Sequence, residues 1–492
     1  MGEHEREGIY VISVIGSTIR LLRDNARAAA VSHDGTKIAF VDPDFKQISV
    51  MDIDGQQVRP LVAAEPGYVV LHPKWSNDGR RISYVKGRPN ADVMEWTLLT
   101  CAPDGTGSVP LFTTDNTVGY DWTPDGRLIL ARTEPPPRRI DSNLWEIRVD
   151  TRTGQPKGEI RRLTDWTGFN FVGLNLTADG KQLVFTNYRP QSDVFMGEAE
   201  AAGQSMKTAE RLTLDERLDW PSGWTRDGKA VLFYSDRAGA FNLYRQSLGA
   251  RTPEAVVINA EQKWSPQLSP DGAWILYMSR ADRKVPVRLM RLPAAGGAPE
   301  LLFELKGAVD FANDPDIAST DESFPSFHCG KQPGTGCIVA ERLGDKLVFS
   351  SFDPAQGRNK EAFTMPVKRA WQHNWDFSPD GTRLAVNTWE RDKSNLQIVT
   401  VADGKATSVV LKDAVRLGRV AWAADGAGWY LISYSSRGNS VVFATLDGKT
   451  RLVYTTPWDL YSALPSPDGR HVAMGMITTN ANVWKIAEFP KQ

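Results

Sequence analysis

The chain has few cysteines, no long apolar run and almost no net charge. Its three cysteines among 492 residues are too few for a disulfide scaffold or a four-thiolate zinc site. No apolar run approaches the roughly 18 residues that a membrane helix needs, so no direct membrane insertion by this chain is expected. A formal net charge of −1 supplies no basic field, which disfavours nucleic acid and anionic lipid as partners.

Common enzyme signatures are also missing from the chain. There is no Gly-x-Ser-x-Gly, so the nucleophile elbow of the propeller-gated serine peptidases is absent. The catalytic loop and magnesium loop of protein kinases are absent too. The segment DGKT at 447–450 resembles the end of a phosphate loop, but Phe443 stands where the leading glycine is required, and we interpret it as a turn. We therefore predict no catalytic residue, no cofactor and no enzyme activity in this chain.

What the chain has instead is a repeated phrase. KWSNDGRRISYV begins at Lys74, DWTPDGRLILAR at Asp121 and GWTRDGKAVLFY at Gly223. Successive copies of its Asp-Gly pair are 44, 47, 54, 48, 44, 109, 45 and 43 residues apart. A period in the forties is typical of four-stranded propeller blades. The nine pairs are Asp34-Gly35, Asp78-Gly79, Asp125-Gly126, Asp179-Gly180, Asp227-Gly228, Asp271-Gly272, Asp380-Gly381, Asp425-Gly426 and Asp468-Gly469.

The residues around each pair predict a hairpin. The position three residues before the Asp is apolar except for Pro465, and apolar residues recur at every second position after the turn. That alternation indicates strands with one buried face. Glycine takes a positive φ without steric cost, and the Asp side chain caps turn amides. Because active sites are singular and turns are repeated, we interpret the nine pairs as structural turns.

Further strands complete each unit. Third strands are expected in NLWEIRVD (143–150), FNLYRQSL (241–248) and NVWKIAEF (482–489), with short fourth strands such as VRPLV and TRLVY. The gap of 109 residues hides a degenerate repeat at 324–367, whose first hairpin is replaced by a loop between Cys329 and Cys337. We predict an all-β propeller of about ten four-stranded blades.

The number of rings and the domain boundary stay open at this stage. The chain forms either one large ring or two adjoining rings. If it divides, we expect blades 1–6 in residues 1–300 and blades 7–10, including the degenerate blade, in residues 301–492. The opening strands GIYVISVI and STIRLL resemble the third and fourth strands of a blade and leave one strand surplus. We therefore expect the natural protein to continue upstream.

Few residues are candidates for chemistry. Cys329 and Cys337 either close a short loop as a disulfide, in an oxidising compartment, or stay as two free thiols. Cys101 is expected in the core. His328 beside Cys329 gives two ligands, which do not make a metal site. Trp371, Trp375 and Arg369 either face a binding surface or fill the space between blades.

One acidic stretch offers hard oxygen ligands for calcium. Asp310, Asp314 and Asp316 lie within VDFANDPDIASTDE at 309–322. The spacing lacks the glycine pivot of a known calcium loop, so a solvated loop is the favoured interpretation and these residues are weak metal candidates.

The phrase W-S-P-D-G-x-x-[IL]-[AV]-[FY] and YSDRAGAFNLYR (234–245) resemble the TolB-like, or PD40, WD40-like β-propeller repeats. The segments FHCGKQPGTGCIVAER and PSPDGRHVAMGMITTNANVWKI are similar to propeller regions of acidobacterial membrane serine/threonine kinases and winged-helix regulators. This resemblance implies a bacterial, extracytoplasmic (periplasmic) signalling protein, with any kinase activity in an upstream domain that this chain lacks. The first residues carry no signal-peptide core, which by itself fits a cytoplasmic protein or a fragment.

Two functions follow. The favoured one is a non-catalytic binding, sensor or scaffold module that takes a protein or small-molecule ligand at the channel mouth or the blade-top loops. The alternative is a propeller-type hydrolase or lyase with a metal or acidic site in the axial channel. Two or more acidic or histidine side chains meeting in that channel would favour the enzyme.

Overall fold

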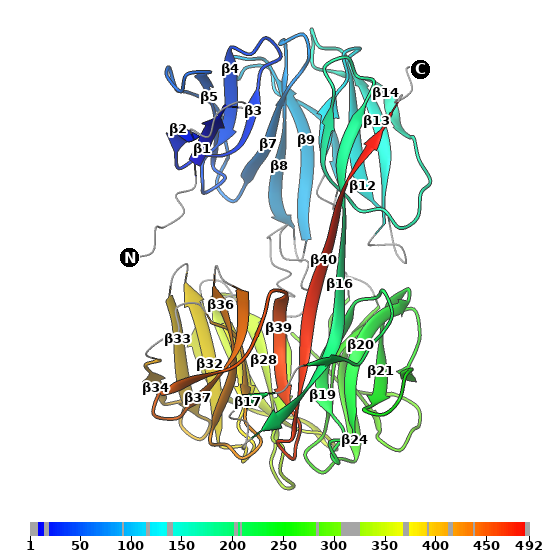
Figure 1. The fold of residues 1–492 in the computed structure, drawn as a ribbon, viewed down its shortest axis with the longest axis vertical. Helices are drawn as coiled ribbons and strands as arrows, with labels where there is room; N and C mark the ends of the chain where they lie inside the picture. The colour runs from blue at the N-terminus through cyan, green and yellow to red at the C-terminus, as the bar shows by residue number, and fades with distance from the viewer. Residues whose placement is uncertain are drawn as a thin grey trace. The chain divides into compact units, whose positions relative to one another are not determined.

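In the computed structural model, every regular element among the described residues is a β strand (Figure 1). The all-β prediction is therefore confirmed. No helix in the described part could cross a membrane. The structure describes residues 8–13, 19–90, 93–114, 119–134, 141–200, 205–206, 209–281, 285–306, 325–367, 373–390, 393–411, 417–435 and 438–487.

The chain forms two compact units, unit 1 (Met1–Arg189 and Asn480–Gln492) and unit 2 (Pro190–Thr479). In the described residues, unit 1 contains one two-stranded and three four-stranded antiparallel sheets of its own. The two-stranded sheet is the predicted pair of opening strands. These sheets are β1 (Gly8–Ile12) and β2 (Ile19–Asp24); β3 (Arg27–Val31), β4 (Lys37–Val41), β5 (Gln47–Asp52) and β6 (Arg59–Ala63); β7 (Val69–Trp75), β8 (Ile82–Asn90), β9 (Val93–Cys101) and β10 (Val109–Thr114); β11 (Tyr120–Trp122), β12 (Arg127–Thr133), β13 (Ser142–Val149) and β14 (Pro156–Arg162).

Unit 2 contains five four-stranded sheets in its described part. Each is a meander in which consecutive strands pair in antiparallel fashion. They are β19 (Asp219–Trp224), β20 (Ala230–Ala238), β21 (Ala240–Ser247) and β22 (Glu254–Val257); β23 (Gln262–Leu268), β24 (Trp274–Arg280), β25 (Arg288–Pro293) and β26 (Glu300–Glu304); β27 (Ser326–Cys329), β28 (Cys337–Leu343), β29 (Lys346–Asp353) and β30 (Gly357–Pro366); β31 (His373–Phe377), β32 (Arg383–Glu390), β33 (Lys393–Thr400) and β34 (Ala406–Val409); β35 (Leu417–Trp422), β36 (Gly428–Ser435), β37 (Gly438–Thr445) and β38 (Thr450–Thr456).

A six-stranded sheet completes the set, and two of its strands contain residues of both units. Figure 1 shows its long strands β16 and β40 side by side, and they are neighbours in the sheet. Its members are β15 (Phe171–Leu176), β16 (Leu183–Glu200), β17 (Ser205–Met206), β18 (Glu210–Arg211), β39 (Asp459–Pro465) and β40 (His471–Ile486).

In unit 2 the inner strands form a closed ring of six blades. Each of β19, β23, β27, β31, β35 and β39 contacts the next, and β39 contacts β19. The sixth blade combines β39 and the start of β40 with the end of β16, so strands from the two ends of the unit pair and close the ring. Closure of this kind leaves only short, protected strand edges.

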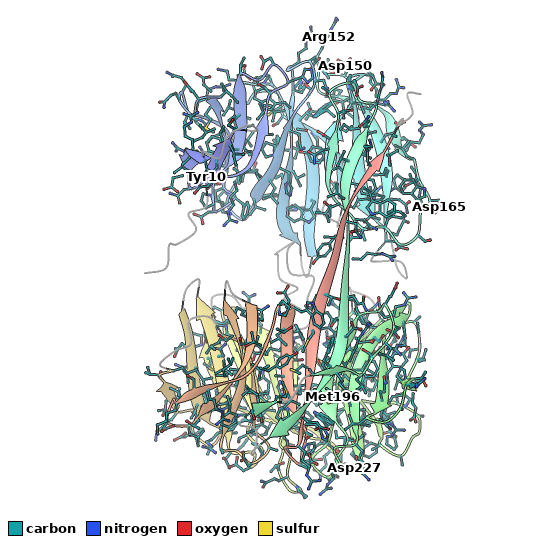
Figure 2. The ribbon with its side chains drawn as sticks, viewed as in Figure 1. Tyr10, Asp150, Arg152, Asp165, Met196 and Asp227 are labelled. Carbon is teal, nitrogen blue, oxygen red and sulfur yellow. A yellow bond between two sulfur atoms is a disulfide. The ribbon has the colours of Figure 1, made fainter. Side chains whose placement is uncertain are left out.

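Each Asp-Gly pair lies in the hairpin between the first two strands of a blade. The nine glycines have φ between 67° and 81°, a region that a Cβ disfavours. At Asp227, labelled in Figure 2, Oδ1 accepts from Thr225 Oγ1 at 2.7 Å and from the Lys229 amide at 3.1 Å. These hydrogen bonds lower the pKa of Asp227, as expected for a carboxylate that caps a turn.

The tryptophans that precede these turns join neighbouring blades. The indole Nε1 of Trp75 donates to the carbonyl of Ala30 at 3.2 Å. Trp224 donates to Leu464 at 3.0 Å. Trp422 donates in the same way to the carbonyl of Asp376 at 3.2 Å. For Trp75, Trp224 and Trp422, the acceptor carbonyl lies four residues before the turn Asp of the preceding blade. The predicted core residues are therefore also hydrogen-bonded links between blades, each contributing about 1 kcal/mol.

Three expectations can be compared with these strands. The degenerate repeat at 324–367 is confirmed as the blade β27–β30. The separate third strand expected at 482–489 is wrong, because residues 471–486 form the single strand β40. No glycine or proline follows Gly475 within that strand, so the strongest turn-forming residues are missing there.

The compact units also differ from the expected division at residues 300 and 301, which falls inside unit 2. A repeat that continues across a boundary with unchanged spacing carries no mark of where one ring ends. Both boundaries lie inside β16 and β40, two strands that are remote in sequence and neighbours in one sheet.

Candidate functional site

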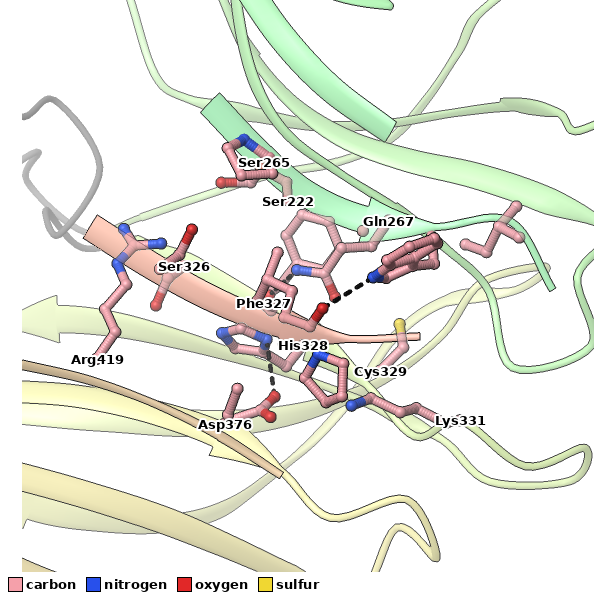
Figure 3. Close-up of a pocket in the computed structure, with 18 of the residues that line it drawn as sticks. Ser222, Ser265, Gln267, Ser326, Phe327, His328, Cys329, Lys331, Asp376 and Arg419 are labelled. Carbon is pink, nitrogen blue, oxygen red and sulfur yellow. Dashed lines mark hydrogen bonds and ion pairs between the residues drawn. The ribbon is translucent and has the colours of Figure 1, made fainter. Parts of the chain in front are cut away.

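The ring of unit 2 surrounds a cavity of about 190 Å³ lined by the inner strands of all six blades (Figure 3). In the five blades that have a turn Asp, the residues six and four positions before it line this cavity. The residues six before are Pro221, Ser265, Asn374, Arg419 and Ser462, and those four before are Gly223, Gln267, Asp376, Ala421 and Leu464.

Side chains of the cavity lining form polar contacts with an adjacent blade of the ring. Gln267 Nε2 donates to the Phe327 carbonyl at 3.0 Å. His328 Nδ1 lies 3.2 Å from Asp376 Oδ1, as Figure 3 shows. Asp376 Oδ2 in turn accepts from the main-chain N of Trp422 at 2.7 Å. These hydrogen bonds join the blades β23–β26, β27–β30, β31–β34 and β35–β38 along one part of the cavity wall.

Asp376 is buried, and burial by itself opposes its ionisation. The hydrogen bond from His328, the positive charge of Lys331 and the amide of Trp422 outweigh that effect and hold the pKa of Asp376 below its ordinary value. The carboxylate is thus ionised at neutral pH. Its Oδ1 also accepts from the Phe377 amide at 2.8 Å, so both oxygens have main-chain donors.

Unit 1 has a counterpart of this carboxylate at the same position of its repeat. Asp121 Oδ2 accepts from the Leu176 amide of the next blade at 2.8 Å. Its other oxygen lies 3.7 Å from Lys74 Nζ. Burial raises the pKa of Asp121. An Asp four residues before the turn is therefore a joint between blades in both units.

Three cationic side chains line the cavity of unit 2. Arg419 stacks on the ring of Tyr461, 3.8 Å from its centroid, and hydrogen-bonds to its hydroxyl. Lys331 Nζ donates to the Trp422 carbonyl at 3.2 Å, and Arg226 donates to the Asp271 carbonyl at 2.7 Å. Figure 3 shows Arg419 and Lys331 on opposite sides of His328.

The structure brings some of the residues singled out from the sequence to this cavity. Cys329 lines it and forms a disulfide with Cys337, with a Cα–Cα distance of 4.0 Å. The thiol beside His328 is therefore not a metal ligand. Trp375 is buried and donates to Ser326 Oγ at 2.9 Å, so it fills the space between blades. Cys101 is buried, and burial raises its pKa to about 12.

The remaining candidates do not meet in a site. Asp310, Asp314 and Asp316, with Trp371 and Arg369, lie outside the described residues. Within the described ranges no group of three or more His, Cys, Asp or Glu side chains is arranged to hold a metal ion. Sequence reasoning missed Arg419, Asp376, Gln267 and Lys331, although the first three could have been found by counting back from each turn Asp.

No protein-family model matches the chain. An uncharacterized protein of Agrobacterium fabrum, Atu1656, is 24% identical over 42% of this chain and 82% of its own length. The Tol-Pal system protein TolB of Francisella tularensis is 24% identical over 39% of this chain, and the match spans only 41% of that relative. The solved structure of TolB from Acinetobacter baumannii aligns with 93% of this chain and 79% of its own, at 12% identity and a TM-score of 0.22. The sequence match to the Francisella protein confirms the predicted resemblance to TolB-like repeats. The resemblance to acidobacterial regulators stays a prediction.

Proposed function

We propose that this chain is a non-catalytic binding module whose ligand or partner segment enters the cavity inside the ring of unit 2, which we call the channel of unit 2. The observation that carries the proposal is the state of Asp376, the carboxylate in the channel wall. Its oxygens accept from the amides of Phe377 and Trp422 and from His328. A carboxylate held in this way stabilises the wall and has little capacity to take a proton from a substrate. The cationic side chains that line the same channel, such as Arg419 and Lys331, can bind a ligand.

The relatives support a role in protein–protein interaction. Those called TolB are Tol-Pal system proteins by name, and a system of that kind joins more than one protein. We extend this to an extracytoplasmic protein of a bacterial envelope system, with signalling as its broader role. The Cys329–Cys337 disulfide supports that location, since such bonds persist in oxidising compartments.

A peptide-display selection on the immobilised full chain tests the proposal. The selected peptides are then measured against Ser222→Trp, which places a large side chain in the channel. Ser247→Trp, on an exposed strand end of the same unit, is the matched control. We expect Ser222→Trp to weaken peptide binding at least about tenfold and Ser247→Trp to leave it unchanged, because a ligand in a pocket is lost when the pocket is filled. Peptides that bind both variants equally well would place the interaction outside the channel and contradict the proposal.

A propeller-type hydrolase or lyase is the second candidate, because His328 and Asp376 do meet in the channel. In that case His328 is the general base, oriented through Nδ1 by Asp376. Turnover of a panel of peptides and acidic oligosaccharides by the wild type, lost in His328→Gln while binding persists, would establish the enzyme. Equal activity of both proteins, or none in either, would leave binding as the function.

A further inference from the structure

The lining of the unit 2 channel differs in charge from the chain as a whole. The chain has a formal net charge of −1. Among the described residues, the channel lining carries the positive side chains of Arg226, Lys331 and Arg419 and the carboxylate of Asp376, a formal charge of +2 with the histidines left out of the count. Such a concentration of one sign inside a concave site raises the local concentration of ligands of the opposite sign.

Hydrogen-bond donors are also present in the channel lining, on Asn374, Ser326 and Arg419. Asn374 Oδ1 accepts from the Val420 amide at 2.7 Å, so Nδ2 is the end of this amide that can donate to a ligand. Ser326 Oγ accepts the indole hydrogen of Trp375, which leaves its own hydroxyl hydrogen for donation. Arg419 contributes a guanidinium, which has donors and no acceptor.

The stacking of Arg419 on Tyr461 suits it to a planar anion. Contact with the ring at 3.8 Å and the hydrogen bond to the hydroxyl restrict its rotamers before any ligand arrives. A pre-organised guanidinium loses less entropy for each hydrogen bond that it forms. Its planar arrangement of N–H groups matches the two oxygens of a carboxylate.

We propose that the channel of unit 2 recognises a carboxylate group, with Arg419 as its main ligand and Asn374 and Ser326 as neutral donors. The inference rests on the proposed function and specifies the chemistry of its ligand. A carboxylate of this kind is either that of a small organic acid or the free C-terminus of a protein chain. A cavity of about 190 Å³ admits both.

Isothermal titration calorimetry on the full chain tests this with two pairs of probes. Succinate is compared with uncharged succinamide, and trialanine with its C-terminal amide. We expect the acids to bind and the amides to bind at least about tenfold more weakly, as charge-assisted hydrogen bonds to arginine are about twice as strong as neutral ones. Binding of succinate alone identifies a small acid, and binding of trialanine alone identifies a chain terminus. Binding of the amides as tightly as the acids overturns the proposal.

Arg419→Gln should weaken binding of the acids at least about tenfold, and Arg419→Lys should retain part of it. Arg245→Gln is the matched control, because Arg245 lies in the same unit and pairs with Glu254 at an exposed site. Near-ultraviolet circular dichroism verifies that each variant is folded. Unchanged affinity in folded Arg419→Gln contradicts the assignment of this residue. The binding function stands if selected peptides bind the wild type and Ser222→Trp prevents their binding. The carboxylate inference nevertheless fails if Arg419→Gln leaves the affinity of these peptides unchanged and succinate does not compete with them.

Discussion

Trp422 binds Asp376 twice across the boundary between two blades of unit 2. Its main-chain N donates to Asp376 Oδ2 at 2.7 Å, and its indole Nε1 donates to the Asp376 carbonyl at 3.2 Å. Trp422 is fully buried. One residue pair therefore fixes both the backbone and the side chains where two inner strands meet at the channel.

Removing the carboxylate should cost more than removing the indole donor. We expect Asp376→Ala to lower the free energy of unfolding by about 2–4 kcal/mol, because the buried amides of Phe377 and Trp422 lose their acceptor. Trp422→Phe removes one hydrogen bond and some packing, at a cost of about 1–2 kcal/mol. Urea unfolding followed by circular dichroism measures both. An Asp376→Ala variant with the same free energy of unfolding as the wild type would show that the carboxylate is not a structural joint.

The disulfide should stabilise the degenerate blade. Cys329 and Cys337 are eight residues apart and buried. Closure of a loop of that length restricts the unfolded chain and contributes about 2–3 kcal/mol. We expect the free energy of unfolding of the double variant Cys329→Ser/Cys337→Ser to be lower by that amount, so that it unfolds at a lower urea concentration. Dithiothreitol should destabilise the wild type and leave the double variant unchanged, and an equal effect of the reductant on both would contradict the prediction.

Buried Lys263 gives stability a pH dependence of defined sign. Its Nζ donates to Asn242 Oδ1 at 2.9 Å and to the Glu261 carbonyl at 2.8 Å, both neutral acceptors. Burial lowers the pKa of Lys263 from 10.5 to about 8. Between these two values the unfolded chain binds more protons than the folded one, so stability rises with pH through this group. Below pH 8 the full cost of the buried charge is present, and above pH 10.5 it is gone.

The comparison of wild type with Lys263→Met isolates this group from other titrations. We expect the free energy of unfolding of the wild type to gain on that of the variant between pH 8 and 10.5, by at most about 1.4 kcal/mol per pH unit. Urea unfolding at intervals of half a pH unit measures the difference. A difference that stays constant over this range would mean that Lys263 keeps its ordinary pKa.

Two turn glycines with the same backbone conformation should differ in their tolerance of a side chain. Gly381 and Gly426 have φ of 70° and 73°. A Cβ on Gly381 would lie 2.9 Å from Thr335 Cβ, whereas one on Gly426 meets nothing within 4 Å. We expect Gly426→Ala to cost about 1–2 kcal/mol through its φ alone and Gly381→Ala to cost more. Equal unfolding midpoints for the two variants would show that the loop carrying Thr335 can move away from the added Cβ with no loss of stability.

The sequence by itself determined the local structure of this protein. Each Asp-Gly pair defines a hairpin, since glycine adopts the φ of 67–81° found there without a steric cost. Alternating apolar residues define the strands, because one face must leave water. The period of the repeat indicated a propeller, and even the blade without an Asp-Gly pair was recognised from the length of the gap.

Only the tertiary structure decided how the blades are grouped and where a site forms. The pairing of β16 with β40 joins segments almost 300 residues apart and closes a ring of six blades. No local signal encodes that pairing, since strand edges carry the same main-chain groups everywhere. Arg419, His328 and Asp376 come from three different blades, and their meeting depends on ring closure. The sequence supplied the residues of the channel, and the geometry of the ring made them neighbours.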